Sequence, residues 1–190
     1  MDKVAGKGTA MTNPIEAWHA DHAYFSRLLE LLRKELDAFH LGRVPNYELM
    51  LDIISYLRDY SDEMHHPRED VAFARMVAYC PDLELLLACL AQEHRVIAHA
   101  GERLRTYLVA ILADTIVPRD EVEISAATYL VYYGNHIATE EKDVLPRAAE
   151  VLTPADWEAV GKAVPHRSDP LFGGSDELYK FLRHQIALES

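Results

Sequence analysis

The chain has few of the residues that define several large classes of protein. It contains two cysteines, Cys80 and Cys89, whose spacing fits neither a metal site nor a redox pair, so we expect both to be reduced packing residues in a cytoplasmic protein. Basic residues are scarce: 19 Lys and Arg face 31 Asp and Glu, and the net charge of -12 argues against nucleic acid or an anionic membrane as a partner. Apolar runs of membrane-spanning length are missing, as is the hydrophobic segment of a signal peptide, so we expect no membrane association.

Strand-like alternation is missing too, whereas apolar residues recur every three or four positions along four long segments. Short turns join these segments, and such segments run antiparallel to their neighbours. We therefore predict an all-α protein, an up-down-up-down four-helix bundle with short extra C-terminal helices. We expect a flexible lead at 1–12, the bundle at 13–163, and a C-terminal loop and helix at 164–190.

Histidine is abundant, with ten residues, and two of them begin the same motif. In His65-x-x-x-Glu69 and His136-x-x-x-Glu140 the imidazole and the carboxylate lie on one face of a helix, where both can reach a common ion. The motif returns after 71 residues, which suggests an internal duplication. Four histidines stand in the apolar stripes where an aliphatic residue would be expected: His22, His65, His94 and His136.

These four histidines fall at similar heights in an antiparallel bundle, because each lies about as far from its turn as its neighbour does. Two histidines and a share of two carboxylates would then serve each of two ions. A single histidine on an apolar face is usually a hydrogen-bonded core residue, but burying Glu69 and Glu140 without cations would be costly. We therefore predict a metal site. Imidazole and carboxylate without thiolate suit iron, manganese or zinc, and two bridged ions with an open position favour iron.

The chain resembles the hemerythrin-like, or HHE cation-binding, family from about Pro14 to Lys162. The motifs that carry the resemblance are Asp21-His22, the segment His65-His-Pro-Arg-Glu-Asp70, Glu93-His94, and His136-Ile-Ala-Thr-Glu140-Glu141 followed by Val144-Leu-Pro146. The resemblance implies a four-helix bundle around a non-haem di-iron centre. By motif, it makes His22, His65, His94 and His136 terminal ligands and makes Glu69 and Glu140 the bridging ligands.

One departure separates the chain from oxygen-carrying hemerythrins, whose third helix carries a His-x-x-x-His pair. Here Ala98 stands four residues after His94, and His99 is turned about 140° away from His94. The ligand set more closely resembles that of bacterial proteins linked to repair of damaged iron centres and to nitric oxide stress. The chain has no N-terminal cysteine-bearing segment of the kind usual in that subgroup.

We predict that the chain is a di-iron protein that binds or senses O2, NO or peroxide, or that handles iron under oxidative or nitrosative stress. A di-iron enzyme (oxidase, peroxidase-like or iron-centre repair) and a metal-stabilised interaction domain stay as alternatives, with a binding role favoured over catalysis. Manganese or zinc in place of iron, the physiological ligand and a homodimer are left open. Whether His19 or Tyr133 takes part in the site is also left open.

The surroundings of the site carry further expectations. His66, Asp70 and Glu141 are expected outside the ligand set or facing solvent, and replacement of Asp70 by alanine is expected to be nearly silent, since it is turned about 100° from Glu69. Gly101 is expected to leave a narrow apolar passage to an open coordination position.

Overall fold

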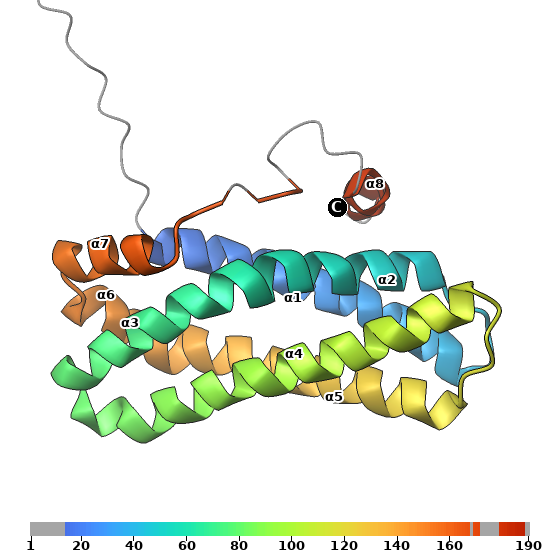
Figure 1. The fold of residues 1–190 in the computed structure, drawn as a ribbon, viewed down its shortest axis with the longest axis horizontal. Helices are drawn as coiled ribbons and strands as arrows, with labels where there is room; N and C mark the ends of the chain where they lie inside the picture. The colour runs from blue at the N-terminus through green and yellow to red at the C-terminus, as the bar shows by residue number, and fades with distance from the viewer. Residues whose placement is uncertain (1–13, 168, 172–178, 189–190) are drawn as a thin grey trace, which may run out of the picture.

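Four long helical arms lie beside one another and alternate in direction (Figure 1). The structure is a computed structural model that describes residues 14–167, 169–171 and 179–188, and this part of the chain contains no strand. The arms are α1 (Pro14–His40); α2 (Tyr47–Tyr56), η1 (Leu57–His65) and α3 (His66–Tyr79) in succession; α4 (Glu84–Leu112), preceded by the short turn η2 (Pro81–Leu83); and α5 (Arg119–Thr139), η3 (Glu140–Val144) and α6 (Leu145–Val151) in succession. The predicted all-α bundle is confirmed.

Local sequence signals explain where some of the helices begin. The side chain of Asn46 caps α2 by accepting a hydrogen bond from the backbone N–H of Leu49 at 3.0 Å. Thr153 and Asp156 form a reciprocal capping box at the start of α7 (Pro154–Ala163). The predicted lead at 1–12 lies outside the described residues.

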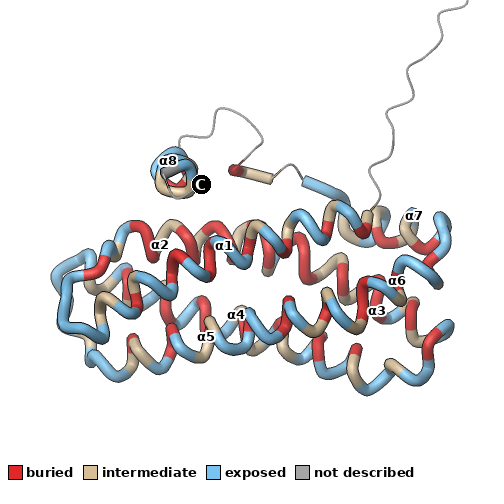
Figure 2. The backbone as a smooth tube through the Cα atoms, turned by 180° about the vertical axis from the view of Figure 1, so that it is seen from behind, coloured by how far each residue is buried: buried red, intermediate tan, exposed pale blue. Residues whose placement is uncertain are grey.

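The hydrophobic core is divided into two clusters that lie on either side of a polar layer. One cluster includes Phe25, Ile97 and Tyr133, and the other includes Trp18 and Leu90. Along α1 and α4 the buried stripe passes from one cluster to the other at a histidine. Figure 2 shows buried positions recurring between exposed ones along each arm. The histidines and glutamates of the polar layer are as buried as the apolar core around them. The bundle thus encloses the polar layer between two apolar clusters.

The C-terminal segments lie on the outside of the second arm. α7 packs against α3, and α8 (Lys180–Leu188) packs against α2. Two phenols hold this layer, since Tyr56 donates a hydrogen bond to Asp169 at 3.0 Å and Tyr179 donates one to Asp59 at 2.8 Å. Leu171 is also buried. Part of the C-terminal loop and helix expected at 164–190, namely residues 168, 172–178 and 189–190, lies outside the described residues.

The structure also bears on the expectations for the two cysteines and for membrane-spanning segments. Cys80 is buried as predicted, but Cys89 is exposed, so its interpretation as a packing residue was wrong. Cys89 lies on the outward face of α4, where an apolar run of leucines hid the difference between inner and outer positions. None of the helices described has the length and apolar character needed to cross a membrane.

Candidate metal centre

Two short π-helical segments interrupt the second and fourth arms at the site. η1 ends at His65, and η3 begins at Glu140. A π-helix widens the turn by one residue and so changes which side chains share a face. Pro67 stands in the first turn of α3, directly after the wide turns, where its missing N–H costs no helical hydrogen bond. The π-helices themselves were missed, because their side chains still fit a helical stripe.

Four imidazoles converge in the polar layer in two pairs, one from each half of the chain. His22 and His65 bring their Nε2 atoms within 3.0 Å of each other, and His94 and His136 bring theirs within 2.9 Å. All four side chains are buried. The structure therefore brings together the four histidines that the sequence singled out.

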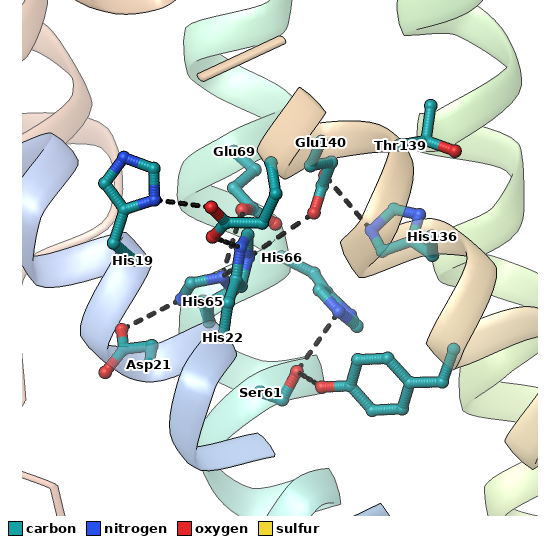
Figure 3. A network of polar contacts seen from close by, with 12 residues as sticks. His19, Asp21, His22, Ser61, His65, His66, Glu69, His136, Thr139 and Glu140 are labelled. Carbon is teal, nitrogen blue, oxygen red and sulfur yellow. Dashed lines mark hydrogen bonds and ion pairs between the residues drawn. The ribbon is translucent and has the colours of Figure 1, made fainter. Parts of the chain in front are cut away.

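Glu69 and Glu140 lie between the two imidazole pairs, and each directs one oxygen toward each pair. Oε1 of Glu69 is 3.0 Å from Nε2 of His65, whereas its Oε2 is 3.5 Å from Nε2 of His94. Glu140 mirrors this arrangement: its Oε1 is 3.1 Å from Nε2 of His136, and its Oε2 is 3.4 Å from Nε2 of His22. Figure 3 shows Glu69 and Glu140 entering the centre from opposite arms.

A second set of carboxylates holds the outer nitrogen of each of these four imidazoles. Each Nδ1 lies within hydrogen-bond distance of one carboxylate, and the four pairs are His22 with Glu141 at 2.8 Å, His65 with Asp21 at 3.0 Å, His94 with Asp70 at 2.9 Å and His136 with Glu93 at 3.1 Å. The pairing crosses between helices, since Asp21 serves His65 and not its own neighbour in sequence. In the second half, Glu93 likewise bonds His136 and not its sequence neighbour His94. The two halves therefore share one pairing scheme, as expected for an internal duplication.

Such carboxylates fix the tautomer of a neutral imidazole. When Nδ1 carries the proton that it donates outward, Nε2 presents a lone pair to the centre. The Nε2 lone pairs of the two histidine pairs then face the four carboxylate oxygens of Glu69 and Glu140. None of these four oxygens has a hydrogen-bond partner, although both side chains are 0% exposed. Acceptors collected in this way without donors require cations. The donor set fits a metal centre.

Protons replace part of this positive charge when metal is absent. Burial lowers the pKa of His65, but the charge of Glu69 and the hydrogen bond to Asp21 outweigh burial and raise the pKa to about 10. Burial likewise lowers the pKa of His94, and the carboxylates of Asp70, Glu140 and Glu69 together raise it to about 11. The pKa of Glu69 moves the other way: burial raises it, and the surrounding imidazoles bring it well below its usual range.

His19, His66 and Ser61 lie next to the centre and differ in burial and in their hydrogen bonds. His19 is half exposed and bonds Glu141 at 2.6 Å, which leaves it outside the imidazole pairs. His66 is buried beside the centre, so it does not face solvent. That it lies outside the ligand set stays a prediction. Its Nε2 lies 3.1 Å from the hydroxyl of Ser61, which is also hydrogen-bonded to the phenol of Tyr133. Ser61 was missed because a lone serine in a stripe carries no signal.

The expected passage beside Gly101 is closed. A Cβ atom at this position would stand 2.8 Å from Cε2 of Tyr129, so the ring already fills the space that the missing side chain leaves. The passage was predicted from the absence of a side chain alone, and the sequence did not reveal that an aromatic residue on α5 packs there. Gly101 is therefore a packing residue that allows α4 and α5 to approach.

Comparison with known proteins agrees with the site. A model of the family described as Hemerythrin HHE cation binding domain matches residues 13–148. The chain belongs to this family. The matched hemerythrin domain covers more than half of the chain and contains all six residues of the centre. A search of curated proteins and a search of solved structures gave no match. The family resemblance seen in the sequence is confirmed, and the buried histidine and glutamate cluster fits the cation binding that the family description names.

Proposed function

We propose that this hemerythrin-family chain holds two iron ions and binds or senses a small ligand, O2, NO or peroxide, or handles iron under oxidative or nitrosative stress. One ion would be held by His22 and His65 and the other by His94 and His136. Glu69 and Glu140 would bridge the two. The observation that carries the proposal is the placement of the glutamate oxygens, one oxygen of each carboxylate beside each imidazole pair.

The donor set supports iron over softer metals. Imidazole and carboxylate ligands without thiolate suit iron, manganese or zinc. Iron in such a site supplies reversible binding of a diatomic ligand or exchange of electrons with it. Around the centre this chain's own residues exclude water: the ring of Phe25 lies 5.2 Å from that of His65, and the ring of Phe73 lies 6.0 Å from that of His94.

The enclosure of the centre favours a small ligand. Among its six residues the most exposed is His94, at 5%. An organic molecule of ordinary size has no direct approach to the glutamates through side chains so deeply buried. O2, NO and peroxide need only transient openings between packed side chains.

A cavity at the edge of the centre favours an enzyme as the second candidate. It has a volume of about 400 Å³, and its lining includes Trp18, Tyr60 and Arg68 together with the outer face of His65 and Asp21. An organic substrate bound there would touch the imidazole that faces the centre on its other side. Such an enzyme would use the same ions but would turn over a substrate.

Anaerobic loading with Fe(II), followed by metal analysis and exposure to O2 or NO, tests the proposal. We expect two ions per chain and an optical spectrum that changes with the gas and reverts when the gas is removed. Zinc-loaded protein is the control and should stay spectrally silent. One ion per chain or fewer, or an iron form that ignores both gases, would overturn the proposal. Sustained consumption of O2 or peroxide with an organic co-substrate would favour the enzyme.

A further inference from the structure

The helix α5 has no charged side along most of its length. From Ile124 to Thr139 a run of 16 residues contains no Asp, Glu, Lys or Arg. Such runs reach eight residues at most in α1 and α4, which both carry charged side chains outward. A helix without a charged side is typical of an interior position, covered all round by other elements.

The bundle nevertheless leaves one side of α5 open. Five exposed residues follow one another along this side at spacings of three, four, four and three, and we call them the α5 stripe: Ile124, Ala127, Val131, Asn135 and Ala138. Ile124 is 60% exposed and Val131 is 59% exposed. The helices α7 and α8 lie on the other side of the bundle in both views (Figures 1 and 2), so neither of them covers the stripe.

The charged residues that border the stripe already have partners within the chain. On the side of α4, Glu121 accepts a hydrogen bond from Arg103 at 2.5 Å. On the side of α1, Glu123 accepts one at 2.8 Å from Arg119, which also reaches the backbone carbonyl of Phe39. An apolar centre with a polar rim of satisfied charges is the usual composition of a protein–protein interface.

We propose that the α5 stripe is the interface of a symmetric homodimer, in which the α5 helices of two copies pack antiparallel with Val131 at the twofold axis. The spacing of the stripe reads the same from both ends, so each Ile124 meets the small Ala138 of the other copy. The proposal is independent of which metal the centre holds.

The charges beyond the two ends of the stripe decide the orientation. Asp120 and Lys142 are both exposed, and each lies 11 residues from Val131, on opposite sides of it. Antiparallel packing about Val131 therefore brings Asp120 of each copy opposite Lys142 of the other. Parallel packing would instead place like charges together, which is unfavourable.

Net charge and area both favour a second copy as the occupant. Two chains of net charge -12 repel each other, and the stripe is an uncharged side on which they can approach. The 21 residues of α5 make a face about 31 Å long. A width of about 20 Å, twice the distance between packed helices, gives about 600 Å² per partner. This is the lower end of the range for specific interfaces, so we expect a reversible dimer.

Sedimentation velocity of the full chain over a wide range of concentrations tests the proposal. We expect a monomer–dimer equilibrium whose dissociation constant rises at least 100-fold in Val131→Glu, which places two like charges at the axis. Val44→Glu makes the same change at an exposed residue of a turn and should leave the dimer intact. Lys142→Glu should weaken the dimer about 10-fold, and the added change Asp120→Lys should restore it.

Cysteine cross-linking in a Cys89→Ser background measures the orientation and does not depend on the folding of the glutamate variant. Val131→Cys should give a disulfide-linked dimer on oxidation. Ile124→Cys alone should not, because antiparallel packing separates its two copies by about 21 Å, whereas a mixture with Ala138→Cys chains should cross-link.

Three results would overturn the dimer interface. The first is a natural protein that stays monomeric at every concentration, and the second is equal weakening of the dimer by Val131→Glu and Val44→Glu. The third is efficient cross-linking of Ile124→Cys with itself, which would contradict the antiparallel arrangement.

Discussion

Nδ1 of His94 donates a hydrogen bond to Oδ1 of Asp70 at 2.9 Å, and the equivalent bond in the other half runs from His22 to Glu141 at 2.8 Å. Asp70 follows Glu69 directly, and Glu141 follows Glu140. Each His-x-x-x-Glu helix therefore supplies one carboxylate to the centre and a second that orients a histidine on a different helix. This explains why two acidic residues end each motif.

Asp70→Ala should weaken metal binding by about 10- to 100-fold, because loss of an outer partner lets the imidazole reorient and reduces its basicity. The geometry thus replaces the expectation, drawn from the facing of the helix alone, that this change is nearly silent. Competition with a coloured chelator measures the affinity. Asp143→Ala is the matched control, since Asp143 pairs with exposed Lys142 and, within the described part of the chain, forms no hydrogen bond or ion pair with a histidine. Equal affinities in the two variants would refute the orienting role.

Glu69→Ala and Glu140→Ala should each reduce the iron content from two ions to one or none, since each carboxylate reaches both imidazole pairs. Metal analysis after anaerobic loading and removal of free iron gives the count. Glu150→Ala changes an exposed residue of α6 and should keep both ions. Two tightly bound ions in either bridging variant would mean that the carboxylates do not join the positions.

The sequence predicted the bundle and the converging residues because both depend on spacing. Leucines and isoleucines at every third or fourth position define the arms, and histidines that interrupt this pattern stand out. The position of His66 could not be predicted in this way. In a regular helix His66 would be turned about 100° from His65 and so away from the centre. In the structure the wide turns of η1 end directly before His66, and its side chain is buried. Periodicity does not reveal where a hydrogen-bond register changes.

The same limit applies to Gly101 and Tyr129. A glycine in a stripe indicates either free space or a close neighbour, and only the packing of α5 on α4 decides between them. The outer carboxylates are an intermediate case: Asp21 and Glu93 were visible beside histidines, but their partners, His65 and His136, lie on other helices. Pairings between distant segments require the three-dimensional arrangement.

Gly101→Ala should lower the free energy of unfolding by about 1–3 kcal/mol, because the added methyl group meets the enclosed ring of Tyr129 at 2.8 Å. Denaturant unfolding followed by circular dichroism measures the change. Gly134→Ala is the matched control in α5, where a Cβ atom has no neighbour within 4 Å. It should raise stability by up to about 1 kcal/mol through helix propensity. A neutral or stabilising Gly101→Ala would show that a passage exists there after all.

Metal-free protein should lose stability as the pH rises above neutrality. The pKa values of His65 and His94 in the folded state, about 10 and about 11, lie above the ordinary value of 6.5. Their contribution to folding is therefore complete below pH 6.5 and disappears as the pH rises toward 10 and 11. Between pH 7 and 9 the folded state binds more protons than the unfolded state, and each such imidazole lowers the free energy of unfolding by up to about 1.4 kcal/mol per pH unit.

Metal should reverse this dependence, because ligands must release their protons to bind and metal affinity therefore increases with pH. Denaturant unfolding at pH 7, 8 and 9, with and without bound zinc, measures both trends. His65→Gln should make the metal-free slope shallower. His40→Gln changes an exposed histidine whose side chain pairs with Glu123, far from the centre in sequence, and should leave the slope intact. A metal-free protein that gains stability from pH 7 to 9 would show that the imidazoles are neutral in the folded state and that the facing nitrogens are not held together by protons.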